Sequence, residues 1–115
     1  MNIQKELSKG SSSLLVLSVL GTGDMYGYQI IKEIEQRSEF VFSFKEGTLY
    51  PILHGFEQEG LVKSYWQDGE RGKRRKYYHI TDCGLKMLSK STEDWHSYSS
   101  AVEKVIRSGL APSAV

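Results

Sequence analysis

The stretch from Ser43 to Tyr78 constrains the fold more than any other part of this chain. Its first half predicts an α-helix, because apolar residues recur at the spacing of one helical face. Gly60 then supplies the left-handed conformation that commonly ends a helix. Residues 62–67 alternate in character as a strand does, and a glycine-containing loop leads into a second such strand over 74–80. A helix that leads into a β-hairpin is the layout of a winged helix. The apolar residues of the helix are Leu49, Ile52, Leu53 and Phe56.

The start of this helix has two alternatives in the sequence. Ser43 and Glu46 have the spacing of a capping box, which predicts a start at Ser43. Pro51 would then lie inside the helix, where it lacks an amide donor and disturbs the preceding turn. The helix therefore either kinks at Pro51 or begins near Thr48, with Pro51 in its first turn. Gly55 lowers helix propensity by about 1 kcal/mol relative to alanine, which suggests that it permits close approach of another backbone.

Positive charge is concentrated at the tip of the predicted hairpin, although the formal net charge is only +1. A local basic patch attracts DNA even on a nearly neutral protein. Contacts from this wing to phosphates would release counterions and make binding salt dependent. Polar and aromatic side chains on the helix suit contacts to base edges and phosphates. The predicted DNA-binding residues are Lys45, Thr48, Tyr50 and His54 on or beside the helix, and Arg71, Lys73, Arg74, Arg75 and Lys76 in the wing.

Two structural alternatives accompany this interpretation. The basic tip can be a solvated turn that only keeps the chain in solution, and Tyr50 can pack against the hairpin as part of the core. Arg74 and Arg75 are neighbours on a strand and should point to opposite faces, so only one of them is expected to reach a given phosphate.

The N-terminal part of the chain predicts two helices. Residues 7–20 carry two overlapping apolar faces, which predicts cover from the chain's own domain on one side and from a partner on the other. Gly21 and Gly23 break this helix, and Asp24 is a suitable N-cap for a second helix from about Met25 to Arg37. The expected inward face of the second helix comprises Tyr26, Ile30, Ile31 and Ile34.

A long final helix is expected after Thr81 and Asp82, which can cap it. Its apolar and small residues recur at alternating steps of three and four, which is typical of a helix-pairing seam. Because such a helix exposes its seam beyond a small core, we expect the same helix of a second chain to cover it. The seam comprises Leu85, Leu88, Thr92, Trp95, Ser99, Val102 and Ile106, and the predicted dimer interface comprises Leu17, Leu88, Trp95, Val102 and Ile106.

Small residues flank Trp95 in this seam and leave room beside its ring. A flat aromatic or cationic ligand could stack on this ring. Equally, Trp95 could anchor the dimer, with the gap beside it filled by Tyr98 or by the partner chain. The predicted ligand-binding residues are Leu7, Gly10, Ser13, Leu14, Thr92, Trp95 and Ser99.

Several classes of function are disfavoured by the sequence. The single cysteine, Cys83, cannot form an internal disulfide, which favours a cytoplasmic location. The longest apolar run is too short to cross a membrane, so no membrane partner is expected. The histidines lack metal-ligand spacing, and no catalytic arrangement is present, so we expect no cofactor, no metal and no enzyme activity.

The sequence resembles the PadR family of transcriptional regulators. The resemblance rests on Tyr26-Gly27-Tyr28, on GTLYPIL followed by FEQEGLV, and on GKRRKYYHITDCG, and it covers nearly the whole chain. With one helix after the wing, the chain is similar to the smaller subgroup of that family, and Trp95 is similar to a tryptophan in a multidrug-sensing member. His54-Gly55 departs from the family, whose members often carry a basic pair there, and this shifts positive charge from the helix to the wing.

The resemblance implies a homodimeric winged helix-turn-helix repressor whose first and last helices form the dimer interface. In some relatives a ligand enters a cavity at that interface and weakens binding to the DNA operator. We therefore expect an α+β, mostly helical fold, with a DNA-binding domain over 1–80 that includes an N-terminal helix over 3–20. A C-terminal dimerisation helix over 81–108 and a flexible tail over 109–115 should follow. The alternatives are a winged-helix module that binds proteins and a carrier of hydrophobic compounds.

Overall fold

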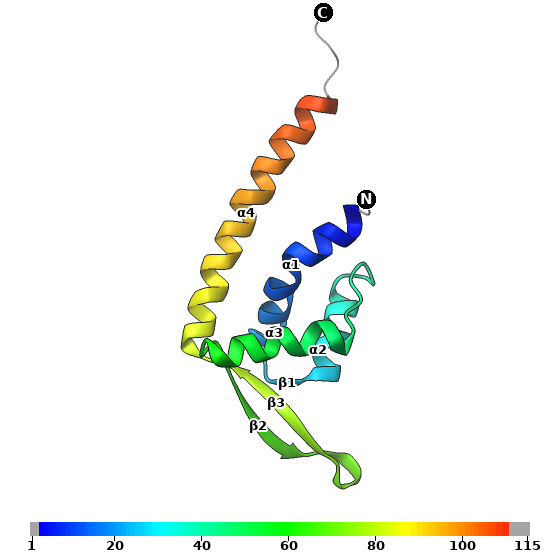
Figure 1. Cartoon of the computed structure of the whole chain (residues 1–115), viewed down its shortest axis with the longest axis vertical. Helices are drawn as coiled ribbons and strands as arrows, with labels where there is room; N and C mark the ends of the chain where they lie inside the picture. Colours follow the sequence, from blue (N-terminus) through cyan, green and yellow to red (C-terminus); the bar gives the residue numbers. More distant parts are fainter. Residues whose placement is uncertain (1–2, 111–115) are drawn as a thin grey trace, which may run out of the picture.

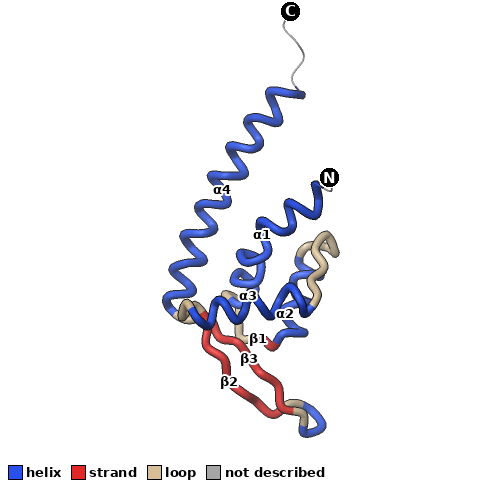
Figure 2. Tube along the Cα trace, viewed as in Figure 1, coloured by secondary structure: helices blue, strands red, loops and turns tan. Residues whose placement is uncertain are grey.

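The fold is a winged helix extended by one long helix. The structure, a computed structural model, describes residues 3–110, with side chains from residue 10 onward. The elements, in chain order, are α1 (Ile3–Leu20), β1 (Met25–Tyr26), α2 (Gly27–Arg37), α3 (Glu46–Gln58), β2 (Val62–Asp68), a 3-10 turn (Glu70–Gly72), β3 (Arg74–Ile80) and α4 (Asp82–Leu110) (Figure 1). The expected fold class, α+β and mostly helical with a winged helix-turn-helix, is confirmed (Figure 2).

The hydrophobic core lies where α1, α2 and α3 meet the base of the hairpin. Leu20 of α1, Ile30 of α2 and Leu49 and Leu53 of α3 are fully buried. Tyr78 and Ile80 on β3 close the core from the side of the sheet. The apolar spacing of α3 thus fixes which face of this helix points inward, and the opposite face carries its polar residues.

The sheet is antiparallel, with strand order β1-β3-β2. Val62 pairs with Ile80 at its base and Asp68 pairs with Arg74 at its tip. The expected start of the second helix at Met25 is wrong, because Met25 and Tyr26 pair with Tyr78 and Tyr77 as a short strand. Asp24 is therefore not a helix cap, and α2 begins only at Gly27.

Helix α3 begins at Glu46, with Lys45 as its N-cap. The capping box expected of Ser43 does not form, and the amides of Thr48 and Leu49 both donate to the Lys45 carbonyl at 3.0 Å. The alternative start near Thr48 is also wrong, so Pro51 lies inside the helix. The helix ends at Gln58, and Gly60 follows it as the expected stop.

Gly60 has φ +75° and the Leu61 amide donates to the Phe56 carbonyl at 2.9 Å. This hydrogen bond across a left-handed residue is the usual helix stop.

Helix α4 begins beside the sheet, where the Gly84 amide donates to the Thr81 hydroxyl at 3.1 Å. This confirms Thr81 as a cap. The helix continues through Leu110, so the expected tail is wrong for Gly109 and Leu110, and residues 111–115 lie outside the described part. With 29 residues and about 1.5 Å per residue, α4 is about 43 Å long, and Figure 1 shows it rising well beyond the rest of the fold.

Candidate nucleic-acid interface

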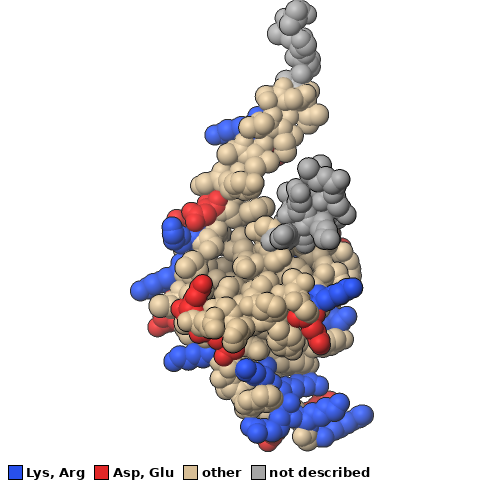
Figure 3. Space-filling model, in the orientation of Figure 1, with Lys and Arg blue, Asp and Glu red and all other residues tan. Residues whose placement is uncertain are grey.

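The tip of the wing is a tight reversal that presents two free cations. The Gly69 amide donates to the Lys73 carbonyl at 2.6 Å, and Arg71 and Gly72 both adopt positive φ, +61° and +73°. Arg71 and Lys73 are exposed, and neither makes an ion pair within the described part of the chain. Figure 3 shows a cluster of blue Lys and Arg side chains at this end of the molecule. The reversal therefore places exposed positive charge at the tip of the wing.

The remaining basic residues of the wing are held by neighbours. Arg75 donates to the Tyr26 hydroxyl at 2.7 Å, and its guanidinium lies 4.4 Å from the centre of the Tyr26 ring. Arg74, on the other face of β3, lies 5.6 Å above the Trp66 ring and 3.7 Å from the Asp68 carboxylate. The two arginines thus point to opposite faces, as strand alternation predicts.

Lys76 is also tied to its own chain. Its Nζ lies 3.7 Å from the Glu57 carboxylate on α3 and 5.7 Å from the centre of the Tyr78 ring. Glu57 in addition accepts a 2.9 Å hydrogen bond from the Ser64 hydroxyl. Burial first, and then the Glu57 charge, raise the pKa of Tyr78. These contacts join α3 to both strands, so α3 and the wing are held together at Glu57.

The predicted residues of α3 are exposed beside this wing. Lys45, Thr48 and His54 are exposed, and His54 contacts Gln58 one turn later at 3.3 Å. Tyr50 is 45% exposed, and a Cβ added to Gly27 would lie 2.5 Å from its hydroxyl. Tyr50 therefore packs against the start of α2 while much of its side chain stays exposed to solvent. It is neither a fully solvated residue nor a residue of the core.

A shallow hollow of about 340 Å³ joins the start of α2, the start of α3 and the wing. Tyr28, Tyr50 and Trp66 line it together with Arg75 and Lys76. Aromatic rings with hydroxyl donors beside cations suit both phosphates and base edges. The hollow places Tyr50 of α3 beside Trp66, Arg75 and Lys76 of the wing on one continuous surface.

Asp24 connects the turn after α1 to both long strands. Its carboxylate accepts a 2.7 Å hydrogen bond from the Tyr65 hydroxyl and lies 2.7 Å from Nδ1 of His79. Partial burial raises the pKa of Asp24, but the hydrogen bonds from Tyr65 and His79 outweigh burial and hold it below its usual value. The same hydrogen bond raises the pKa of Tyr65.

Along this face of the sheet, the Tyr77 ring stacks on that of Tyr65 with centres 5.7 Å apart and meets the Tyr26 ring edge to face with centres 5.4 Å apart. The contacts of Asp24 with Tyr65 and His79 also brace the wing. The sequence did not predict them, because these residues lie 41 and 55 positions from Asp24.

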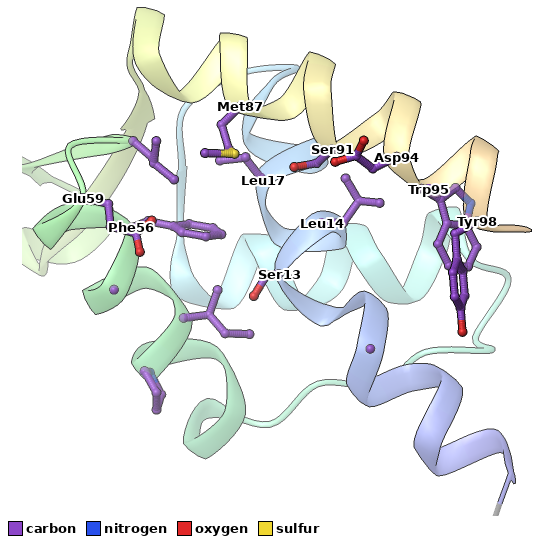
Figure 4. Close-up of a pocket in the computed structure, with 15 residues that line it drawn as sticks. Ser13, Leu14, Leu17, Phe56, Glu59, Met87, Ser91, Asp94, Trp95 and Tyr98 are labelled. Atoms are coloured by element: carbon purple, nitrogen blue, oxygen red, sulfur yellow. The ribbon is translucent and has the colours of Figure 1, made fainter.

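A groove of about 880 Å³ runs between α1, α3 and α4 (Figure 4). Of the predicted ligand-binding residues, Gly10, Ser13, Leu14 and Trp95 line this groove. Trp95 is 42% exposed, and its ring lies 6.3 Å from that of Tyr98. The structure thus brings together the small residues of α1 and the aromatic residues of α4, as the sequence predicts.

The other predicted ligand residues lie differently. Thr92 and Ser99 are absent from the groove lining, and their hydroxyls donate to the carbonyls of Leu88 and His96. The side chain of Leu7 lies outside the described part. Among the predicted interface residues, Leu17 is only 2% exposed and belongs to the core of this chain. Leu88 packs partly against that core, while Val102 and Ile106 are exposed.

Helix α3 also forms a wall of this groove, which the sequence did not predict. Pro51, Ile52, Gly55, Phe56 and Glu59 all line it. The expectation that Gly55 admits another backbone is wrong within this chain, because no atom lies within 4 Å of a Cβ built there. Gly55 instead leaves open space in the groove beside α3. Helical spacing in α3 would have allowed this second face to be found.

Comparison with known proteins identifies the family. The sequence profile of the transcriptional regulator PadR-like family matches residues 16–90. The chain belongs to this family. The fold agrees, since a transcriptional regulator from Clostridium thermocellum has 36% identity and a TM-score of 0.78 over 86% of this chain and 96% of its own. A PadR family transcriptional regulator from Eggerthella lenta has 36% identity and a TM-score of 0.77 over 88% of this chain and 86% of its own.

Membership in the PadR family makes this chain a transcriptional regulator and implies that it binds DNA. The transcriptional regulator YqjI of Escherichia coli is 28% identical over 78% of this chain, which spans 42% of YqjI. Within the residues that the structure describes, no helix has the length and apolar character to cross a membrane. No group of three potential metal ligands occurs in that same part of the chain.

Proposed function

We propose that this PadR family member is a cytoplasmic, homodimeric repressor of a pseudo-palindromic DNA operator. Helix α3 would enter the major groove of each half-site, and the wing would lie along the neighbouring phosphates. The observation that supports this proposal is the continuous surface that joins Tyr50 of α3 to Arg75 and Lys76 of the wing, whose tip also bears the exposed cations Arg71 and Lys73. Residues 1–80 would act as the DNA-binding part and residues 81–108 as the dimerisation part.

The dimer is supported by the exposed seam of α4. Trp95, Val102 and Ile106 are large apolar residues with about half of their surface open in the single chain. A helix with such a face gains stability when a second copy covers it. A two-fold dimer would hold its two recognition helices about 34 Å apart, which is one turn of DNA.

A comparison of binding to two DNA duplexes tests whether this chain is a sequence-specific regulator. Fluorescence anisotropy would compare a duplex from upstream of the protein's own gene with an unrelated duplex of equal length. We expect tighter binding to the first, and Thr48→Ala and His54→Ala should reduce that preference while leaving the unrelated duplex unaffected. A lost base contact weakens discrimination by about 1–3 kcal/mol, whereas phosphate contacts carry no sequence information. Equal binding to both duplexes at every salt concentration would favour a module that binds proteins.

A small aromatic or hydrophobic effector is the second part of the proposal. Trp95 and Tyr98 form an aromatic end of the groove, and Asp94 provides negative charge beside them (Figure 4). In a Trp66→Phe variant the remaining tryptophan fluorescence reports on Trp95 alone. We expect a flat cationic dye to quench that fluorescence and to release the operator at the same concentrations. Quenching without release would indicate a carrier.

A further inference from the structure

Trp66 is an exposed aromatic residue on the face of the wing that turns toward α3. It pairs with Lys76 across β2 and β3, and strand alternation puts it on the same face as Ser64. That face meets α3, because the Ser64 hydroxyl donates to the Glu57 carboxylate at 2.9 Å. Trp66 is nevertheless 57% exposed. Its position on the sheet therefore leaves much of a large ring open to a partner.

Two more exposed aromatic residues lie around the same hollow. Tyr28 of α2 is 60% exposed and lines the hollow together with Tyr50 of α3 and Trp66. Gly27 shapes the hollow, because a Cβ at that position would lie 2.5 Å from the Tyr50 hydroxyl and would displace it. Glu46 lines the hollow as well, and its charge disfavours a small free anion as the occupant. Exposed rings gathered in this way mark a surface that contacts another macromolecule.

Trp66 lies between the two parts of the surface proposed to bind DNA. Tyr50 of α3 borders the hollow on one side. On the other side, Asp68 is two residues farther along β2, about 7 Å away, and pairs with Arg74 at the tip end of the hairpin. This interval is shorter than the width of a major groove, which is about 12 Å. A duplex that contacts both α3 and the tip of the wing therefore also covers Trp66.

The cations beside Trp66 are held by carboxylates of the same chain. Arg74 lies 5.6 Å above the Trp66 ring and 3.7 Å from the Asp68 carboxylate. Lys76, which pairs with Trp66 across the strands, lies 3.7 Å from the Glu57 carboxylate. Because these charges are compensated within the chain, contact with this part of the wing depends on the ring more than on charge. The face of the ring can pack on the C–H groups of a deoxyribose, and the indole N–H can donate to a phosphate oxygen.

We propose that Trp66 contacts the sugar-phosphate backbone of DNA and is a non-ionic anchor between α3 and the tip of the wing. The ring covers a deoxyribose, and the indole N–H donates to a neighbouring phosphate oxygen. This inference rests on the proposed DNA binding and adds a residue that was not among those predicted from the sequence. Such a contact is the same on every DNA sequence and releases no counterion. Trp66 therefore raises affinity without changing sequence preference or salt dependence.

Affinity measurements test this role of Trp66. Fluorescence anisotropy of the two duplexes, at several salt concentrations, compares the wild type with Trp66→Ala and Trp66→Phe. We expect Trp66→Ala to weaken binding to both duplexes by the same factor, about tenfold, which is toward the lower end of what an aromatic contact to nucleic acid contributes. The salt slope and the ratio of the two affinities should not change. Trp66→Phe keeps a flat ring and should retain most of the affinity.

Gln67→Ala is the matched control. Gln67 is the next residue of β2, is also exposed, and lies on the opposite face of the sheet. We expect this variant to bind both duplexes as the wild type does, because its side chain points away from the proposed contact.

Tryptophan fluorescence tests the contact itself. The chain has two tryptophans, Trp66 and Trp95, so the difference between the wild type and Trp66→Phe isolates the signal of Trp66. Adding either duplex at saturating concentration should change that signal and protect it from quenching by acrylamide, because the bound backbone covers the ring. This measurement needs no alanine variant, so it decides the question even if Trp66→Ala fails to fold.

The other outcomes separate this inference from the proposed function. DNA binding that leaves the fluorescence and the acrylamide quenching of Trp66 unchanged would overturn the inference and leave DNA binding intact. The same holds for unchanged affinity in a folded Trp66→Ala, for a shallower salt slope or a lower sequence preference in that variant, and for an equal loss of affinity in Gln67→Ala. Failure of the wild type to bind either duplex would overturn both the inference and the proposed function.

Discussion

Replacing the two free cations of the wing tip should change how DNA binding depends on salt. In Arg71→Ala/Lys73→Ala each wing loses two charges that no carboxylate of the described chain neutralises. A dimer would thereby lose four phosphate contacts. Each contact contributes about 0.9 to the slope of log affinity against log salt, so the slope should become shallower by about 3.6. Over a fourfold rise in salt, the wild type should then lose about 150-fold more affinity than the variant.

The assay is fluorescence anisotropy of a labelled duplex at several sodium chloride concentrations. Arg75→Ala is the matched control, because the Arg75 guanidinium is held by the Tyr26 hydroxyl at 2.7 Å and by the Tyr26 ring. We expect this control to leave the slope nearly unchanged, although it removes one positive charge from the same hairpin.

Two results would refute the reasoning. A slope that is unaffected by Arg71→Ala/Lys73→Ala would show that the tip does not reach phosphates. A change of about half that size in Arg75→Ala, which removes half as many charges, would show that net charge, rather than the contacts described for each cation, decides the electrostatic contribution. In the second case the distinction between free and tethered basic residues in the wing would be wrong.

Three further predictions concern stability and ionisation. Gly84→Ala should destabilise the fold by about 1–3 kcal/mol, because its Cβ would press on the Leu61 carbonyl and the Ile80 side chain, whereas Gly55→Ala should stabilise the open helical site by up to about 1 kcal/mol. Urea unfolding measures both, and changes of the same sign would contradict the packing argument. Asp24→Asn should lower the pKa of Tyr65 toward its ordinary value of 10.0, because the carboxylate that accepts the Tyr65 hydrogen bond loses its charge. Ultraviolet absorbance during alkaline titration, with Tyr65→Phe to assign the signal, tests this, and an unchanged titration would exclude the interaction. The lowered pKa of Asp24 means that its ionised form stabilises the fold fully above the ordinary value of 3.8, and that this contribution is lost as the pH falls through the lowered folded value. In Asp24→Asn, the free energy of unfolding should not show this decrease at low pH. Identical dependence of stability on pH in the variant and the wild type would show that the Asp24 carboxylate does not contribute to stability.

Local sequence signals predicted the parts of the fold that depend on neighbouring residues. The left-handed stop at Gly60, the cap at Thr81 and the strand alternation that separates Arg74 from Arg75 all follow from residues within a few positions of one another. The start of α3 was misjudged for the same reason. The spacing of Ser43 and Glu46 satisfied a local rule, but the chain before Lys45 serves to bury Phe44 in the core and does not continue the helix.

Contacts between distant residues could not be read from the sequence. Asp24 is a good helix cap by local preference, yet the pairing of β1 with β3 places it beside Tyr65 and His79, and its carboxylate bonds there instead. Likewise, the contribution of Pro51, Gly55 and Glu59 to the groove depends on the direction in which α4 leaves the sheet.

The sequence by itself thus determined the helices, the hairpin, the basic tip and the family, because periodicity, turn residues and motifs are properties of short segments. Only the tertiary structure decided which cations of the wing are free, since Arg75 and Lys76 are held by Tyr26 and Glu57 from other elements. It also decided that one face of α3 and the aromatic residues of α4 share one groove. Such relations arise from packing between segments, and a side chain's neighbours across a core are set by the whole fold.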